Sequence, residues 1–139
     1  MTGRLAGSRV VVVGAGTDDR GDPEAPVGNG RAIAVRAAQE GAAVVCVDRD
    51  GDAAEATAAL VRAEGAEASV VVADVAQAEA CERLVAESGA FDGLVLNVGV
   101  GFGRRLSGTD ADDWDRTFAV NVRSHFLVTR AAFEVLGEG

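Results

Sequence analysis

The sequence predicts an α/β fold in which helices cover both faces of a parallel sheet. Short Val-rich runs alternate along the chain with longer Ala-rich stretches, which is the alternation of strand and helix that a parallel sheet requires. The Val-rich runs are continuous, a pattern typical of strands buried on both faces. With 139 residues, the chain is long enough for one domain with a substantial core, and we expect a single domain over 1–139.

The expected elements follow one another as four strand–helix units. Strands are predicted at 10–13, 43–47, 69–73 and 94–96. Helices are predicted at 29–40, 52–64, 76–88 and about 110–136. The first three helices are each followed by a glycine, which readily adopts the positive φ that ends many helices: Gly41, Gly65 and Gly89. We therefore expect a right-handed, doubly wound layer that stops after the fourth unit.

One segment interrupts the alternation of strands and helices. We call this segment, residues 17–27, the inserted loop. It carries four carboxylates, two prolines and almost no apolar residue. It separates the first strand from the first helix, where connections are usually a few residues long. We interpret it as a solvated surface excursion rather than as a lid. Its carboxylates would repel a phosphate if the loop folded over one.

A glycine-rich turn follows the first strand. Gly14 and Gly16 come directly after it, and Gly28, Asn29 and Gly30 open the first helix. A literal Gly-x-Gly-x-x-Gly pattern fails, but without residues 18–27 the spacing becomes Gly-xxx-Gly-x-Gly, with Thr17 inside it. Glycines let the backbone turn tightly and approach a ligand, and a helix N-terminus favours phosphate. We favour a dinucleotide site over packing alone.

Acidic residues follow two of the strands. Asp48 comes 18 residues after Gly30, where a carboxylate can accept both hydroxyls of an adenosine ribose and repel a 2′-phosphate. This favours NAD, although the adjacent Arg49 could pair with that phosphate and keeps NADP possible. Asp74 and Val75 suit a contact with the adenine edge. Alternatively or in addition, Asp74 caps the following helix.

Together these pieces resemble the short-chain dehydrogenase/reductase family. The resemblance covers nearly the whole chain and is carried by the glycine turn, Asp48, Asp74-Val75, and the segments 92–99 (Asp-Gly-Leu-Val-Leu-Asn-Val-Gly) and 114–122 (Trp-Asp-Arg-Thr-Phe-Ala-Val-Asn-Val). The family's Asn-Asn-Ala-Gly appears as Leu96-Asn97-Val98-Gly99, which matches at Asn97 and Gly99. Val13 stands where the family usually has Thr.

The resemblance implies a Rossmann-type fold and NAD(P)-dependent hydride transfer involving a small alcohol or carbonyl substrate. It places Asn97 and Gly99 beside the cofactor ribose. Asn121 matches the Asn of the family's catalytic set, which holds a water in the proton relay. In addition, a mid-helix Asn can satisfy a kinked backbone. The family's Ser and Tyr-xxx-Lys cannot be placed, because the sequence contains no Tyr and no Lys.

Composition and charge exclude several functions. With 13 Arg and 22 acidic residues the net charge is −9, which argues against nucleic acid or anionic membranes as partners. The apolar run at 10–13 is too short for a leader or a membrane span, so we expect a cytoplasmic protein. Cys46 and Cys81 lie in apolar contexts without a CxxC partner or a nearby His. They are expected to be reduced core residues rather than metal ligands.

The last helix is apolar on more than one side. Trp114, Phe118, Val122 and Phe126 form one row, and a second row contains Val120, Leu127, Ala131 and Val135. Such a helix must be covered on more than one face, and the family uses it as a subunit interface. The fourth strand would also keep an open edge. We therefore expect a homo-oligomer or a completing second chain, with His125 in a structural or interface role.

Three functions are compatible with the sequence. The first is the cofactor-binding half of a short-chain dehydrogenase/reductase, whose Tyr and Lys come from elsewhere. The second is a module that binds a dinucleotide without turning it over. The third is an S-adenosylmethionine-dependent methyltransferase, which also uses a glycine-rich turn and an acidic residue after the second strand. The segments 97–99 and 114–121 argue against the third.

Overall fold

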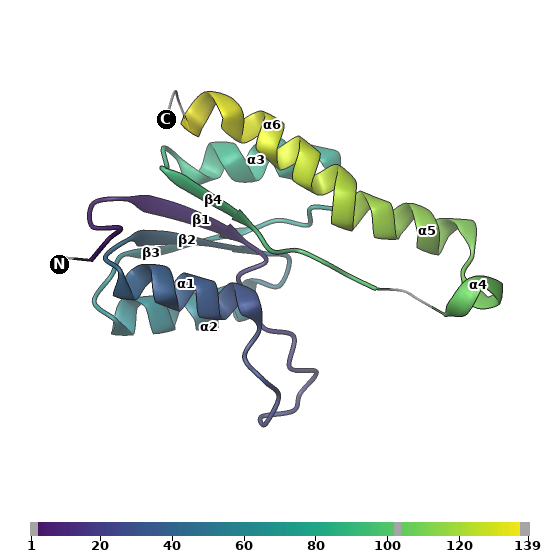
Figure 1. Ribbon diagram of the computed structural model, residues 1–139, viewed down its shortest axis with the longest axis horizontal. Helices are drawn as coiled ribbons and strands as arrows, with labels where there is room; N and C mark the ends of the chain where they lie inside the picture. Colours follow the sequence, from purple (N-terminus) through teal and green to yellow (C-terminus); the bar gives the residue numbers. More distant parts are fainter. Residues whose placement is uncertain (1–2, 102–103, 137–139) are drawn as a thin grey trace.

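The fold is a four-stranded parallel sheet between two layers of helices (Figure 1). The computed structural model describes residues 3–101 and 104–136. The strands are β1 (Arg9–Val13), β2 (Ala43–Asp48), β3 (Ala68–Val72) and β4 (Gly93–Leu96). They are ordered β3-β2-β1-β4, and every neighbouring pair is parallel. The predicted α/β class is confirmed.

Burial differs between the inner and the outer strands. The Val-rich inner strands β1 and β2 are buried over most of their length, as predicted. The prediction of strands buried on both faces was wrong for β3 and β4. Val72 of β3 is 52% exposed, and every residue of β4 is half-buried. An edge strand has a neighbour on one side only, so a continuous apolar run does not guarantee burial.

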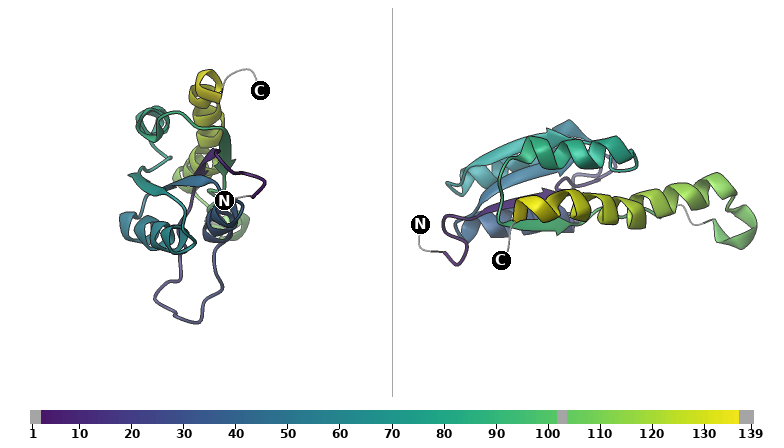
Figure 2. Two further views of the ribbon diagram at one scale, coloured as in Figure 1. Left: turned by 90° about the vertical axis from the view of Figure 1, so that its left-hand side faces the viewer. Right: turned by 90° about the horizontal axis from the view of Figure 1, so that it is seen from above.

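Helices cover the two faces in pairs (Figures 1 and 2). α1 (Asn29–Gln39) and α2 (Gly51–Ala63) lie on one face, and α3 (Ala78–Ser88) and α6 (Ser124–Leu136) lie on the other. Alanines dominate the first layer, whereas Leu84 anchors the second. The small alanine side chains let α1 and α2 pack closely on the Val side chains of the sheet.

The helix boundaries follow the predicted caps with one exception. Gly41, Gly65 and Gly89 all have positive φ, at 94°, 84° and 69°, as expected for glycines after helices. The alternative role of Asp74 as an N-cap was wrong. Its Oδ1 accepts the N–H of Ala76 at 3.0 Å, which closes a tight turn, and α3 begins two residues beyond this N–H, at Ala78.

The expected last helix is divided into several pieces. After the short α4 (Arg105–Gly108) come α5 (Ala111–Phe118), the π-helical turn η1 (Ala119–Arg123) and α6. A buried row recurs every four residues along η1 and α6: Val120, Ser124, Val128 and Ala132. Of this row, only Val120 was among the apolar rows predicted from the sequence.

The predicted row of Trp114, Phe118, Val122 and Phe126 is between 46% and 60% exposed. α4 and α5 project beyond the sheet (Figure 1), so the sheet does not cover the start of this row. Trp114 and Phe118 stack on each other, with ring centroids 4.9 Å apart.

Both cysteines are buried and free. Burial raises the pKa of the Cys46 thiol to about 11 and also raises that of Cys81, whose Sγ donates to the Val75 carbonyl at 3.4 Å. Both thiols are therefore protonated near neutral pH and are poor nucleophiles. Within 3–101 and 104–136, no helix is long and apolar enough to cross a membrane.

The second core layer can be tested at Leu84, which is fully buried. We expect Leu84→Ala to lower the free energy of unfolding by about 2–5 kcal/mol, because it removes buried methyl groups and leaves a cavity. Leu106→Ala is the control, since Leu106 is 96% exposed and should change stability by at most about 0.5 kcal/mol. Equal losses in urea denaturation would contradict the assignment of this core.

Candidate functional site

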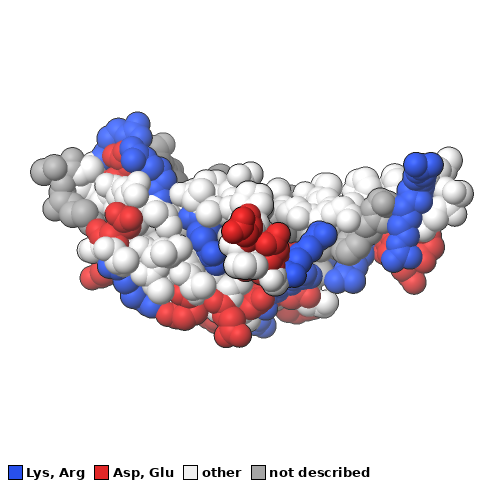
Figure 3. Space-filling view, turned by 90° about the horizontal axis from the view of Figure 1, so that it is seen from below, with Lys and Arg blue, Asp and Glu red and all other residues white. Residues whose placement is uncertain are grey.

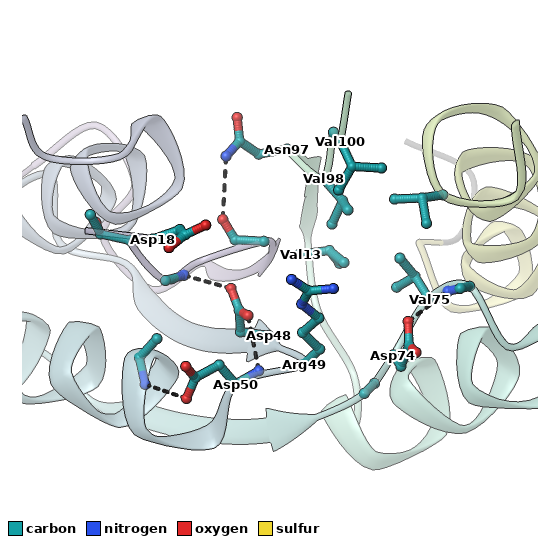
Figure 4. Close-up of a pocket in the computed structure, with 18 of the residues that line it drawn as sticks. Val13, Asp18, Asp48, Arg49, Asp50, Asp74, Val75, Asn97, Val98 and Val100 are labelled. Carbon is teal, nitrogen blue, oxygen red and sulfur yellow. Dashed lines mark hydrogen bonds between the residues drawn. The ribbon is translucent and has the colours of Figure 1, made fainter. Parts of the chain in front are cut away.

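A cavity of about 420 Å³ lies at the carboxyl edge of the sheet (Figure 4). Its walls come from the segments that follow all four strands and from the start of the last helical region. The sheet order reverses between β1 and β4, and doubly wound sheets bind ligands at the carboxyl ends of their strands, beside such a reversal. The volume suits a small ligand or part of a cofactor.

The glycine turn requires glycine for steric reasons. Gly14 has a φ of 82°, which favours glycine. A Cβ on Gly30 would lie 1.8 Å from the Gly14 carbonyl oxygen, so α1 packs directly against the turn. A Cβ on Gly16 would lie 2.9 Å from Asp48 Oδ2. Close packing therefore explains the glycine at position 30. At Gly16, the turn contacts the end of β2.

The inserted loop leaves and rejoins the turn at one point. The Gly28 N–H donates to Thr17 Oγ1 at 3.0 Å, so the two ends of the loop adjoin. Thr17 and Gly28 are therefore neighbours in space, as the Gly-xxx-Gly-x-Gly spacing without residues 18–27 requires. Residues 18–24 are exposed, which confirms the predicted surface loop. Its first residues, Asp18, Asp19 and Arg20, line the cavity.

Asp48 is held in one orientation by two backbone donors. Oδ2 accepts the Gly16 N–H at 2.9 Å, and Oδ1 accepts the Asp50 N–H at 3.1 Å. Each carboxylate oxygen keeps a lone pair for a further donor such as a ligand hydroxyl. The neighbouring Arg49 points its guanidinium into the cavity (Figure 4). The Asp48 carboxylate, an acceptor, and the Arg49 guanidinium, a cation, are therefore neighbours in the cavity wall.

The opposite wall of the cavity is largely apolar. Asp74 and Val75 lie across from Asp48 (Figure 4), and Val75 is buried. Further valines from other segments also line the cavity: Val13, Val98, Val100 and Val120. A wall of this kind can accommodate the face of a flat aromatic group.

Asn97 connects β4 to the glycine turn. Its Nδ2 donates to the Gly14 carbonyl at 3.3 Å, and its backbone N–H donates to Val13 at 2.9 Å. Gly99 follows two residues later in the cavity wall. Asn97 therefore holds the segment after β4 against the turn.

Asn121 lies in η1 and binds the same segment from the other side. Its Oδ1 accepts the Val100 N–H at 2.8 Å, and its Nδ2 donates to the Val100 carbonyl at 2.7 Å. The side-chain amide is thus paired with the backbone N–H and C=O of one distant residue rather than with its own helix. His125 Nε2 lies 3.2 Å from the Val98 carbonyl, a backbone contact that accords with the structural role expected for it.

The structure brings most of the predicted cofactor residues together. Those lining the cavity are Gly14, Gly16, Thr17, Asp48, Arg49, Asp74, Val75, Asn97 and Gly99. Gly28, Asn29 and Gly30 stand behind the turn and are not among the lining residues. Asn29 instead borders a second hollow, between α1 and β4. The N-terminus of α1 has no side-chain cap in the described structure.

Several residues that line the cavity were not predicted from the sequence: Asp18, Asp19, Arg20, Asp50, Val98, Val100, Arg116 and Val120. Asp50 and Val98 could have been found, because they directly follow strands whose carboxyl ends share one edge. No local signal marks Arg116 or Val120. Their place depends on where the last helical region lies relative to the carboxyl edge of the sheet.

The fold and this site define a Rossmann-like α/β protein, and comparisons with known proteins identify its family. The model of the short chain dehydrogenases matches residues 25–139. The chain is 36% identical over 137 residues to 2-(S)-hydroxypropyl-CoM dehydrogenase 3 of Xanthobacter autotrophicus and 37% identical over 148 residues to (3R)-3-hydroxyacyl-CoA dehydrogenase of Mus musculus. These alignments cover 95% and 96% of this chain, and 49% and 52% of the relatives.

Solved structures agree with this assignment. A dehydrogenase/reductase from Sinorhizobium meliloti superposes with a TM-score of 0.83 at 33% identity, covering 96% of this chain and 51% of that one. A metagenomic short-chain oxidoreductase in complex with NADP gives 0.78 at 33% identity, covering 91% and 55%. The chain belongs to the short-chain dehydrogenase/reductase family. It spans about half the length of the curated relatives that it matches.

The pairing of Asn121 with Val100 can be tested by a single atom-scale change. Asn121→Asp removes the donor to the Val100 carbonyl and places two acceptors together, so we expect a loss of about 1–3 kcal/mol in unfolding free energy. Asn29→Asp is the matched control, because this exposed residue starts α1 and a carboxylate is favourable there. A loss at position 121 no larger than at 29 would contradict the paired geometry.

Proposed function

We propose that this chain forms the cofactor-binding half of an NAD(P)-dependent oxidoreductase. The observation that carries the proposal is the Asp48 carboxylate, fixed at the cavity by the Gly16 N–H at 2.9 Å. A backbone-oriented acceptor beside a glycine turn suits the hydroxyls of an adenosine ribose. The apolar wall around Val75 would take the adenine. The diphosphate would extend past the cavity lining at Thr17 to the N-terminus of α1, which has no side-chain cap among the described residues and adjoins Thr17 through Gly28.

NAD is the favoured cofactor within this proposal. Asp48 would repel a phosphate on the ribose 2′ position, whereas Arg49 would attract one. NADP therefore stays the alternative, and one solved relative is described in complex with NADP. We favour NAD because both oxygens of Asp48 are held in place by backbone donors, which fixes the repulsive group at the site.

The relatives' names, which describe dehydrogenases of a hydroxypropyl and a hydroxyacyl compound, support a proposed substrate class. We propose an alcohol or the corresponding carbonyl compound, with hydride exchanged with the bound nicotinamide. Asn121 would position the segment containing Val100 beside the reacting groups. The sequence contains no Tyr and no Lys, so groups outside these 139 residues would supply the proton transfer. Family membership favours this function over the methyltransferase alternative.

A module that binds a dinucleotide without turnover is the second candidate. The same lack of Tyr and Lys favours it. The two candidates agree on cofactor binding and differ on activity once the residues that complete the fold are supplied. Hydride transfer to a carbonyl substrate in such a complemented protein would support the enzyme. Retained NADH binding without turnover across a substrate panel would support the module.

The proposed cofactor site is tested by NADH titration followed by fluorescence. We expect Asp48→Asn to weaken NADH binding about tenfold, or about 1.4 kcal/mol, because the charged acceptor for the ribose hydroxyls is lost. Asp52→Asn makes the same change four residues away, outside the cavity lining, and should bind as the parent does. Binding of S-adenosylmethionine but not NADH by the parent would overturn the proposed function.

We also propose that a second copy of this chain or a completing chain covers the exposed apolar row of the last helices. Large apolar patches on a surface generally mark interfaces. Sedimentation velocity should show concentration-dependent association of the parent, and Val122→Ser with Phe126→Ser should reduce it. Both residues are more than half exposed, so the fold should survive. A monomeric parent at all concentrations would contradict this interface.

A further inference from the structure

The inserted loop contributes charge to the candidate cofactor site. Asp18 and Asp19 line the same cavity as Asp48. The chain contacts Asp48 at Gly16, whose N–H is bonded to Oδ2, and Asp18 follows two residues later. Figure 4 shows Asp18 on the same side of the cavity as Asp48, across from Asp74 and Val75. The loop therefore begins beside the group that we assign to the adenosine ribose.

Local hydrogen bonds hold these carboxylates at the start of the loop. Asp18 Oδ1 accepts the Arg20 N–H at 3.2 Å, and Asp19 Oδ1 accepts the Gly21 N–H at 2.9 Å. Arg20 Nε lies 3.9 Å from Asp18 Oδ2, but these two side chains are 88% and 75% exposed. An ion pair this exposed and this long contributes little, so Arg20 offsets little of the charge of Asp18, whose own field acts at short range because solvent screens it.

The charge balance of the cavity is negative, and the loop makes it more so. The lining contains five carboxylates and three guanidinium groups, of which the loop supplies two carboxylates and one guanidinium. Further along the loop, Asp22 and Glu24 add two more acidic groups. Acidic side chains gather at the centre of the face from which the loop protrudes (Figure 3).

We propose that the inserted loop is a selectivity element, in which Asp18 and Asp19 add to Asp48 in excluding a cofactor phosphorylated on the adenosine ribose. The inference rests on the proposed function of the same cavity. A phosphate monoester carries between one and two negative charges near neutral pH, and a ribose hydroxyl carries none. Carboxylates beside the ribose therefore penalise NADPH far more than NADH, and they oppose the attraction that Arg49 offers.

The test compares NADH and NADPH binding by fluorescence titration, since the two cofactors differ only in this phosphate. In the double variant Asp18→Asn, Asp19→Asn, the NADPH-to-NADH ratio of dissociation constants should fall about fivefold, with NADH itself changing less than about twofold. Asparagine keeps the side-chain oxygen that accepts the loop N–H groups, so the loop geometry is retained. The difference should shrink in 0.5 M salt as screening increases (about 4–5 Å Debye length).

The matched control is Asp22→Asn with Glu24→Gln. It removes the same charge from the same loop, at residues outside the cavity lining, and should leave the ratio within about twofold of the parent. An equal fall in the control would show that overall charge, and not the position of Asp18 and Asp19, sets the preference, and would overturn the proposal. An unchanged ratio in the double variant with NADH still bound would also overturn it.

Deletion of residues 18–27 gives a second, independent variant. The Gly28 N–H lies 3.0 Å from Thr17 Oγ1, so the two ends adjoin and the shortened chain can be closed between them. The deletion should lower the ratio at least as far as the double variant does. If the parent and all variants fail to bind NADH, the proposed function fails and the inference fails with it. NADH binding with an unaltered ratio refutes the inference alone.

Discussion

The arrangement of the candidate site depends on the backbone N–H and C=O of Gly14. Its N–H donates to Val47 of β2 at 2.8 Å, and its carbonyl accepts Nδ2 of Asn97 at 3.3 Å. α1 packs so closely against this carbonyl that only glycine fits at Gly30. β1, β2, the segment after β4 and the start of α1 are therefore joined at one residue. Because side chains are excluded there, the backbone itself forms the wall of the cavity where a cofactor would approach.

A second constraint is electrostatic. Several carboxylates lie at this edge of the sheet, and backbone N–H groups donate hydrogen bonds to them. Asp48, Asp50 and Asp74 each accept from nearby backbone donors. These bonds fix the orientation of the carboxylates, so their remaining lone pairs can accept from the hydroxyl groups of a ligand.

The accuracy of the sequence predictions followed the range of the interactions involved. Strands and the first three helices were placed to within two residues, and the glycines that end those helices were found, because hydrophobic period and positive φ are local properties. Asp74 failed as a helix cap since its bond to the Ala76 N–H closes a turn ahead of α3. The π-helical turn was missed because it accompanies the pairing of Asn121 with Val100, 21 residues away.

The sequence by itself determined the α/β class, the glycine turn and the acidic residue that ends β2, since each is recorded within a few neighbouring residues. Only the tertiary structure decided which distant side chains share the cavity. Asp18 reaches it because the inserted loop closes on Thr17 and Gly28. Val120 reaches it because the neighbouring Asn121 binds the backbone of Val100 in the cavity wall. The exposure of Trp114, Phe118, Val122 and Phe126 was also a tertiary outcome. Their helical spacing marks an apolar row, but packing alone decides whether anything covers it.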